Sequence, residues 1–355
     1  MQLIDLGWDS SFDKSFESFN DRNLSPARIA RENRNNYLTL SSDGELVGEL
    51  SGKFHNETNG SAGRPAIGDW VTISPRPNEG RATIHALFPR KSAFVRKVAG
   101  MITEAQIVAA NIDTVFIVCG LDNNFNPRRV ERYLALAWES GATPVVILNK
   151  VDLCDDAESL VAEIESIAIG VPVHPISAVA GTGLAVFSDY LTTGKTAAFL
   201  GSSGVGKSTI INSLLGAERL KVGEVREYDG RGRHTTSFRE LILLPGGGIV
   251  IDTPGMREIQ VWGDDEGLKQ AFDDIQALAL QCRFTDCNHH TEPGCAVKKA
   301  VLDGTLDPDR LRSYMKLKRE LQYLAARQSF KASIIEKNRW KKISQYQKSL
   351  KKKGH

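Results

Sequence analysis

The sequence predicts a multidomain fold: an N-terminal β-barrel of the oligonucleotide-binding (OB) type, a central parallel α/β domain, and a C-terminal, mostly helical domain with a metal site. At 355 residues the chain is longer than the roughly 250 residues at which a single hydrophobic core stops growing. Short segments of β type come first, apolar strands alternating with helices follow, and clustered cysteines precede a basic helical stretch. This order predicts three domains.

The expected domain boundaries follow these changes of pattern. Residues 1–35 mix Ser, Asp, Asn and Arg without sustained periodicity, and we interpret them as an N-terminal extension. The barrel is expected over residues 36–104 and the α/β domain over 105–274. The metal-binding domain with its basic tail is expected over 275–355.

The barrel is predicted from β-type segments at residues 37–40, 45–54, 70–74 and 82–88, which Gly-, Pro- and Asn-rich turns separate. Basic side chains are scattered through this part of the chain. They suit an oligonucleotide-binding barrel, although a solvated barrel surface explains them equally well. These residues are Lys53, Arg64, Arg76, Arg81, Arg90, Lys91, Arg96 and Lys97.

Composition and charge exclude some classes of protein. With 41% hydrophobic and 25% charged residues the chain is typical of soluble globular proteins, and no apolar run approaches the roughly 20 residues of a membrane span. Its first residues lack the pattern of a secretory signal, so we expect a cytoplasmic protein. The net charge is only +2, but from residue 310 onward only Glu320 and Glu336 oppose many Lys and Arg, which favours contact with nucleic acid.

The central domain is predicted from alternating strands and helices. Residues 114–119 form an expected buried strand, 127–140 a helix and 144–148 the next strand. The tetrapeptide Asn149-Lys150-Val151-Asp152 then falls at the carboxyl end of a strand, where open α/β sheets bind ligands. A further strand at residues 247–251 ends at Asp252.

A glycine-rich loop between a strand at residues 197–200 and a helix at 208–215 fits the P-loop pattern Gly-x-x-x-x-Gly-Lys-[Ser/Thr]. Its backbone N–H groups and the helix N-terminus are expected to bind phosphates, Lys207 to reach the β- and γ-phosphates, and Ser208 to coordinate Mg²⁺. A chance match is the alternative. The phosphate-binding candidates are Gly201, Ser202, Ser203, Gly204, Val205, Gly206, Lys207, Ser208 and Thr209.

The base-reading residues separate GTP from ATP, which a P-loop alone does not. Residues 149–152 resemble the Asn-Lys-x-Asp element of translation-factor-type GTPases, in which the aspartate, here Asp152, accepts hydrogen bonds from guanine N1 and the exocyclic amine. Adenine presents the opposite donor pattern and would leave that carboxylate unpaired. The same resemblance implies that Asn149 supports guanine and its neighbouring loop, that the Lys150 stem packs over the ring, and that Ser177-Ala178 supplies a backbone donor to O6.

Two further segments are expected to be switches. Asp252-Thr253-Pro254-Gly255 fits Asp-x-x-Gly, which places Asp252 near the magnesium shell and the Gly255 N–H near the γ-phosphate. The glycine-rich residues 230–236 are the expected first switch, with an ordinary solvated loop as the alternative. Thr236, or otherwise Thr235, is the candidate for the second hydroxyl ligand of Mg²⁺ and a candidate catalytic residue with Lys207.

The position after Asp-x-x-Gly holds Met256, where many GTPases carry a glutamine that orients the attacking water. A thioether cannot orient water in this way, so we expect slow intrinsic hydrolysis that depends on a partner or another side chain. His234 is the candidate catalytic side chain, and an RNA contact is its alternative role.

Three thiolates and an imidazole within a short segment predict a closed structural zinc site. The ligand candidates are Cys282, Cys287, His289 and Cys295, with His290 as the alternative imidazole. Core cysteines are the alternative explanation. Basic helices expected over residues 311–330 and 334–350 carry interleaved aromatic residues, which favours binding of RNA phosphates over a merely solvated face. The aromatic residues are Tyr314, Tyr323, Trp340 and Tyr346.

In order and spacing these motifs resemble the ribosome small subunit-dependent GTPase A family over nearly the whole chain. The resemblance implies a circularly permuted GTPase, with the base-reading motif before the P-loop, flanked by an OB barrel and a zinc domain. It also implies that a monomer binds the small ribosomal subunit and its rRNA during late maturation and hydrolyses Mg²⁺-bound GTP to GDP and phosphate. Hydrolysis would be stimulated by the subunit and coupled to release.

The permuted order places the second switch next to the metal-binding domain, so we expect phosphate loss to reorient that domain. Two other hypotheses remain open on the sequence. One is a nonenzymatic RNA-binding scaffold with a static nucleotide, and the other is a GTPase that acts on the large ribosomal subunit.

Overall fold

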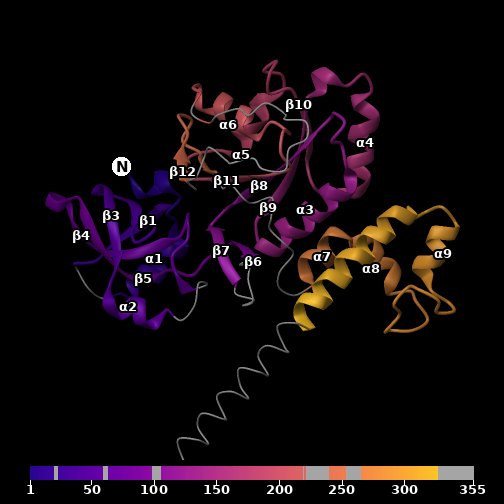
Figure 1. Ribbon diagram of the computed structural model, residues 1–355, viewed down its shortest axis with the longest axis horizontal. Helices are drawn as coiled ribbons and strands as arrows, with labels where there is room; N and C mark the ends of the chain where they lie inside the picture. Colours follow the sequence, from indigo (N-terminus) through magenta and orange to yellow (C-terminus); the bar gives the residue numbers. More distant parts are fainter. Residues whose placement is uncertain are drawn as a thin grey trace, which may run out of the picture.

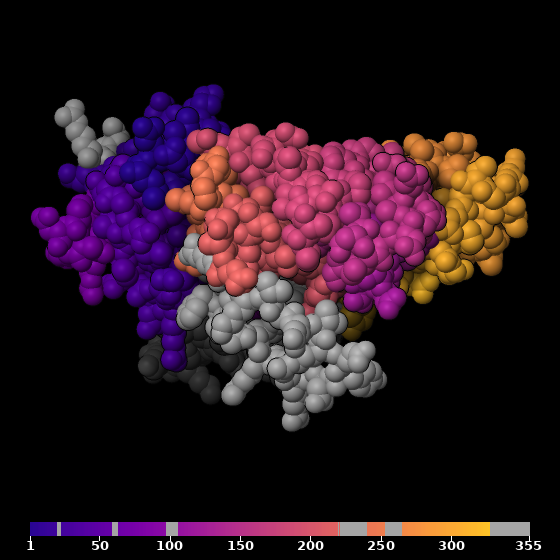
Figure 2. Space-filling model, turned by 90° about the horizontal axis from the view of Figure 1, so that it is seen from above, coloured from indigo at the N-terminus to yellow at the C-terminus, as the bar shows by residue number. Residues whose placement is uncertain are grey.

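The computed structural model describes residues 1–19, 23–58, 63–97, 105–218, 220, 240–252 and 265–326. These residues form a barrel, a mixed sheet with helices on both faces, and a helical C-terminal part. The three parts lie side by side in that order (Figure 1). The space-filling view shows the same order, with the sheet and its helices between the barrel and the C-terminal part (Figure 2).

The barrel closes in the strand order β1-β2-β3-β5-β4, which confirms the predicted OB-type barrel. Strands β3 and β5 pair in parallel, and the other neighbours are antiparallel. Alternating apolar side chains such as Ile29, Leu46, Ile73 and Ile84 fill its core. The strands are β1 (Ser25–Glu32), β2 (Tyr37–Ser41), β3 (Gly44–Leu50), β4 (Trp70–Arg76) and β5 (Arg81–Leu87).

The predicted start of the barrel at residue 36 is wrong, because β1 lies before it. An arginine in the middle of a strand is normally expected to be exposed to solvent, yet Arg28 of β1 is only 1% exposed. Its guanidinium donates hydrogen bonds to the carbonyls of Leu6, Gly68 and Asn111. Through these carbonyls the buried arginine joins the first residues, the barrel and the start of the central sheet. A charged residue in the middle of the segment also breaks the apolar pattern by which a buried strand is recognised in a sequence.

The first residues are also packed rather than a loose extension. The 3₁₀-helix η1 (Leu3–Leu6) and α1 (Ser10–Glu17) lie against the barrel. Between them, the Trp8 ring stands edge-on to Trp70 at 4.8 Å and to Phe88 at 5.4 Å. Aromatic pairs of this geometry add to the stabilisation that burial alone provides.

The expected strand over residues 45–54 is too long. Strand β3 ends at Leu50, because the Ser51 hydroxyl caps α2 (Gly52–Glu57) by accepting from the Phe54 N–H at 3.2 Å. The 3₁₀-helix η3 (Pro77–Glu79) makes the turn between β4 and β5. A two-stranded ribbon of β6 (Ala93–Lys97) and β7 (Ala105–Ala110) follows the barrel.

The central sheet has the strand order β10-β9-β8-β11-β13-β12 and is parallel except for the edge strand β12. Every residue of β8 is buried, as the apolar run predicts for a central strand covered on both faces. The strands are β8 (Thr114–Gly120), β9 (Thr143–Asn149), β10 (Val173–Ile176), β11 (Thr196–Leu200), β12 (Glu240–Leu243) and β13 (Ile249–Asp252).

Helices cover the two faces of this sheet. On one face α3 (Pro127–Ser140) and α4 (Ala157–Ile167) share a core with one set of β8 side chains. On the other face α5 (Phe187–Tyr190) and α6 (Lys207–Leu215) pack on the alternate set. The Asn126 side chain caps α3 and Gly141 ends it in the left-handed region, so the predicted helix over 127–140 is confirmed.

The C-terminal part is helical, as predicted. It contains α7 (Glu266–Ala271), α8 (Asp273–Ala279), α9 (Ala296–Leu302) and helical residues 308–326. The basic helix expected over 334–350, with Trp340 and Tyr346, lies outside the described residues. Among the helices of the described ranges, none has the length and apolar character needed to cross a bilayer.

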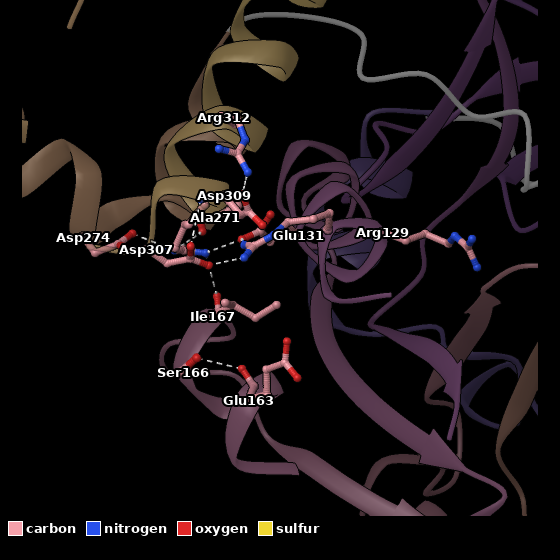
Figure 3. A network of polar contacts seen from close by, with 12 residues as sticks. Arg129, Glu131, Glu163, Ser166, Ile167, Ala271, Asp274, Asp307, Asp309 and Arg312 are labelled. Atoms are coloured by element: carbon pink, nitrogen blue, oxygen red, sulfur yellow. Dashed lines mark hydrogen bonds and ion pairs between the residues drawn. The ribbon is translucent and has the colours of Figure 1, made fainter. Parts of the chain in front are cut away.

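A buried ionic network joins α3 to the C-terminal part. Glu131 of α3 is fully buried and accepts hydrogen bonds from Arg128 at 2.6 Å and Arg310 at 3.0 Å. Arg310 also donates to Asp274 at 2.6 and 2.7 Å and to the Ala271 carbonyl at 3.1 Å. Figure 3 shows Glu131, Asp274 and Ala271 converging from separate helices. This network fixes the C-terminal part to α3.

Replacement of Arg310 by methionine is expected to lower the free energy of unfolding by about 3–5 kcal/mol, because it removes the buried arginine that pairs with both Glu131 and Asp274 and leaves the buried Glu131 with Arg128 alone of its two arginine partners. Urea unfolding followed by circular dichroism measures the change. The matched control is Arg312→Ala, which removes an exposed ion pair with Asp309 and is expected to cost less than about 1 kcal/mol. Equal effects of the two substitutions would contradict the assigned role of the network.

Candidate nucleotide site and metal centre

The glycine-rich loop lies between β11 and α6, at the carboxyl edge of the sheet. Gly201 and Gly206 have φ angles of 154° and 98°. A Cβ at Gly201 would overlap the Val118 carbonyl of β8, and one at Gly206 would overlap the Asn149 side chain. Glycine therefore allows the loop to lie directly against the ends of β8 and β9, with the N-terminus of α6 pointing into the turn.

Lys207 lies over the start of this loop. Its ammonium donates hydrogen bonds to the carbonyls of Gly201 at 2.8 Å and Ser202 at 2.6 Å. Phosphate oxygens are charged acceptors and form stronger hydrogen bonds with an ammonium than neutral carbonyls do. The lysine is thus positioned to transfer its hydrogen bonds to a phosphate held by the loop.

Asn149 connects the three segments that the sequence assigned to nucleotide binding. Its side-chain nitrogen donates to the Val205 carbonyl at 2.8 Å, and its side-chain oxygen accepts from the Ala178 N–H at 3.0 Å. Asn149 is only 2% exposed, so both bonds are shielded from water. A backbone donor to guanine O6 is predicted from Ser177-Ala178, and here the Ala178 N–H of this pair donates to Asn149. Ser177 beside it is buried, and its hydroxyl accepts from Ala180.

Lys150 and Asp152 follow Asn149 just beyond the carboxyl end of β9. Lys150 has a positive φ of 72° and forms an ion pair with Asp122 at 2.6 Å, while Asp152 is exposed on the 3₁₀-helix η4 (Val151–Leu153). Burial alone would raise the pKa of Asp122, but hydrogen bonds from Lys150 and Asn124 outweigh burial and lower it. Sequence reasoning missed Asp122, although its place just after a buried strand, like that of the Asn-Lys-Val-Asp motif, was the available signal.

Asp252 ends β13 beside the phosphate-binding loop. Burial raises the pKa of its carboxyl, Glu240 adds to this, and the positive charge of Lys207 opposes it. A partly buried carboxylate close to the first turn of α6, which carries Ser208, supplies the oxygen donors that Mg²⁺ prefers. These residues therefore fit a Mg²⁺ ion bound together with a nucleotide.

Several predicted site residues lie outside the described residues. In the second switch they are Thr253, Pro254, Gly255 and the neighbouring Met256. In the first switch they are His234, Thr235 and Thr236. Their predicted roles stay predictions.

The four predicted metal ligands meet at one point. The donor atoms of Cys282, Cys287, His289 and Cys295 all lie within 4.8 Å of one another. The Cys282 and Cys295 sulfurs are 3.9 Å apart, and the His289 Nδ1 is 3.8 and 3.5 Å from them. With a metal–sulfur distance of about 2.3 Å, the edge of a tetrahedral site is about 3.8 Å, so the geometry fits.

The segment between Cys287 and Cys295 is shaped to present His289. His289 has a φ of 61°, in the left-handed region that non-glycine residues rarely adopt, whereas the alternative ligand His290 is exposed. The Glu292 carboxylate accepts hydrogen bonds from the N–H groups of Asn288, His290 and Thr291. With its own N–H as the largest cause, these bonds lower the pKa of Glu292 to about 2.

Comparison with known proteins agrees with this geometry. The model of the RsgA GTPase family matches residues 87–262. A protein of Opitutus terrae named "Small ribosomal subunit biogenesis GTPase RsgA" is 48% identical over 98% of both chains. The chain belongs to the RsgA GTPase family. A relative of the same name from Syntrophotalea carbinolica is 43% identical, with 97% of this chain and 96% of the relative covered.

Solved structures agree with the family. The crystal structure of YjeQ from Thermotoga maritima matches with a TM-score of 0.65 at 28% identity, over 84% of this chain and 99% of that one. YloQ, described as a circularly permuted GTPase, matches with a TM-score of 0.62 at 23% identity, over 85% and 96%, and shows the same fold. The predicted permuted GTPase with a barrel and a Cys₃His cluster is confirmed, and RsgA membership makes the chain a GTP hydrolase.

Loss of one cysteine donor is expected to weaken metal binding at the cluster, because three remaining donors hold a divalent ion less tightly. Cys295→Ser should therefore lower the metal content per chain and the thermal midpoint of the C-terminal part. Elemental analysis of the purified protein measures the first, and Cys154→Ser, which lies outside the cluster, is the control. Equal metal content in the two variants would contradict the assignment.

Proposed function

We propose that this GTPase binds the small ribosomal subunit, hydrolyses GTP late in the maturation of that particle, and leaves it after a hydrolysis step that the particle stimulates. The observation that carries the proposal is the match over 98% of the chain to a relative named for small-subunit biogenesis. The barrel and the C-terminal part lie on opposite sides of the sheet, so one large particle can contact both (Figure 1).

The partner surface is proposed to be ribosomal RNA. On the helical residues 308–326, the side chains of Arg312, Lys316 and Arg319 are exposed. Cations on an exposed helix bind phosphates without reading sequence. The chain is proposed to act as a monomer in the cytoplasm.

We assign the nucleotide contacts by the geometry of the three joined segments. Asp152 is proposed to read the guanine edge, Asn149 to hold the loops around the base, and Lys150 to cover the ring. Lys207 is proposed to contact the β- and γ-phosphates, with Thr236 and His234 as catalytic residues of the first switch. The remaining proposed contacts are Ser177, Ala178, Gly201, Ser202, Ser203, Gly204, Val205, Gly206, Ser208, Thr209, Asp252 and Gly255.

Two metal ions complete the proposal. Ser208, Asp252 and Thr236 would hold Mg²⁺, which neutralises phosphate charge when it is bound with GTP. The Cys₃His cluster is proposed to hold one structural Zn²⁺, since three thiolates and an imidazole in tetrahedral spacing suit that ion and leave no open position.

The coupling of hydrolysis to release is proposed to pass through α7. This helix follows the second switch in sequence and packs on α3, where Gly267 lies so close to the Ala135 carbonyl that a Cβ would overlap it. The Gly267 N–H also donates to Glu139 at 3.4 Å. A displacement of the second switch would therefore strain the contact between α3 and the C-terminal part.

Small subunits are expected to raise the rate of multiple-turnover GTP hydrolysis by at least roughly tenfold, because a partner must supply the water-orienting group that Met256 cannot provide. Phosphate release is measured with purified small subunits, large subunits or neither. Lys207→Ala is the inactive control in all three arms. Stimulation by large subunits alone, or by neither particle, would contradict the proposal.

Substitution of Asp152 by asparagine is expected to lower GDP affinity by at least tenfold, about 1.4 kcal/mol or more, because the amide nitrogen faces two guanine donors. Xanthine carries an acceptor in place of the exocyclic amine, so affinity for its nucleotide should rise. Titration with fluorescent GDP and competition by xanthosine diphosphate measure both. Asp156→Asn, at the cap of the next helix, is the matched control. Unchanged selectivity would show that Asp152 does not read the base.

A further inference from the structure

Arg129 on the first turn of α3 is a cation that the motifs of the sequence do not account for. We propose that Arg129 is a catalytic residue supplied by the chain itself, and that its guanidinium contacts the γ-phosphate of GTP. The inference rests on the GTPase activity of the family and is independent of which particle stimulates it.

The side chain of Arg129 reaches across to the phosphate-binding loop. Its guanidinium donates a hydrogen bond to the Ser202 hydroxyl at 3.0 Å and a weaker one to the Asn124 carbonyl at 3.5 Å. The cap of α3 fixes its backbone, because the Arg129 N–H donates to the Asn126 side chain at 3.0 Å. The arginine therefore extends from a rigid helix start, so phosphate binding has to order its side chain but not its backbone.

The contact with Ser202 places Arg129 at the γ-phosphate end of the loop. A P-loop lysine reaches the β- and γ-phosphates, and Lys207 here lies on the carbonyls of Gly201 and Ser202. Two cations thus converge on one residue, Lys207 on its carbonyl and Arg129 on its hydroxyl. Phosphate oxygens that replace these carbonyls as hydrogen-bond acceptors of Lys207 would therefore lie within reach of the Arg129 guanidinium.

The arginines on either side of Arg129 have a different role. Arg128 pairs with Glu131 and Asp307, and Arg132 forms a two-bond pair with Glu320 at 2.7 and 2.8 Å. Among the residues that the structure describes, Arg129 has no such carboxylate partner. Figure 3 shows it pointing away from the side of α3 on which Glu131 and Asp309 gather. Within the described ranges its hydrogen bonds go to a hydroxyl and a carbonyl, neutral acceptors that a phosphate oxygen readily replaces.

The positive charge of Arg129 has a use in the chemical step of GTP hydrolysis. The oxygen of a water molecule forms a bond to the γ-phosphorus while the bond from that phosphorus to the β–γ bridging oxygen breaks. The electron pair leaves on GDP, and both protons of the water go with inorganic phosphate. Negative charge on the transferring oxygens is stabilised by a guanidinium, and an arginine in this role accelerates phosphoryl transfer by roughly 10³–10⁵-fold. Met256 stands where many GTPases carry a water-orienting glutamine. A guanidinium stabilises the transferring oxygens without having to orient the water, so this role of Arg129 does not need that glutamine.

The test measures single-turnover GTP hydrolysis by the full chain without ribosomal particles. Arg129→Ala is expected to lower the rate at saturating GTP by at least roughly tenfold. The affinity for a nonhydrolysable GTP analogue should fall several-fold, while GDP affinity stays within about twofold, because GDP lacks the contacted group. Arg129→Lys should recover much of the analogue affinity but little of the rate, since an ammonium lacks the planar fork. Arg34→Ala, an exposed arginine far from the loop in sequence, is the charge-matched control.

Two results would overturn the proposal. A rate within about twofold of the parent in both Arg129 variants would show that the guanidinium does not stabilise the transferring group. An equal fall in affinity for GDP and the analogue would show that Arg129 only shapes the loop through Ser202. Either result leaves the proposed action on the small subunit intact, because no particle is present in the assay.

Discussion

The side-chain amide of Asn149 is the interaction on which the nucleotide site depends. Two hydrogen bonds, one to the Val205 carbonyl and one from the Ala178 N–H, tie the end of β9 to the phosphate-binding loop and to the loop after β10. Because both partners are backbone groups in a buried place, losing the amide would leave a donor and an acceptor unpaired. The permutation changes the order of these segments along the chain, but the parallel sheet still brings their ends to one edge.

Helix α3 extends this arrangement to the C-terminal part. One side of its first turns reaches the phosphate-binding loop through Arg129, and the other binds the C-terminal helices through Arg128, Glu131 and Arg132. The barrel is attached by a similar device at the other end of the sheet, where buried Arg28 donates to three backbone carbonyls. At each joint one arginine is buried, Arg310 on carboxylates of α3 and α8 and Arg28 on backbone carbonyls, so a change at the nucleotide has rigid elements to act on.

Local chemistry explains which features the sequence predicted. Gly201 and Gly206 mark a loop in which any side chain would collide, and the spacing of Cys282, Cys287, His289 and Cys295 allows four donors to meet. These patterns depend on residues that are close together in the chain, so the sequence alone is enough to recognise them. The strand β1 was missed because Arg28 is buried by acceptors more than twenty residues away, and Arg129 was missed because its partner lies 73 residues on. Long-range polar contacts leave no local signature.

The measurement that tests this account most directly is guanine-nucleotide binding by Asn149→Ala, compared with the parent chain and with its unfolding midpoint. If the amide holds the three segments together, GDP affinity falls by at least tenfold, about 1.4 kcal/mol or more, while circular dichroism still shows a folded chain. ATP should bind neither form measurably. An unchanged GDP affinity in a folded Asn149→Ala variant would contradict the claim that this residue assembles the site.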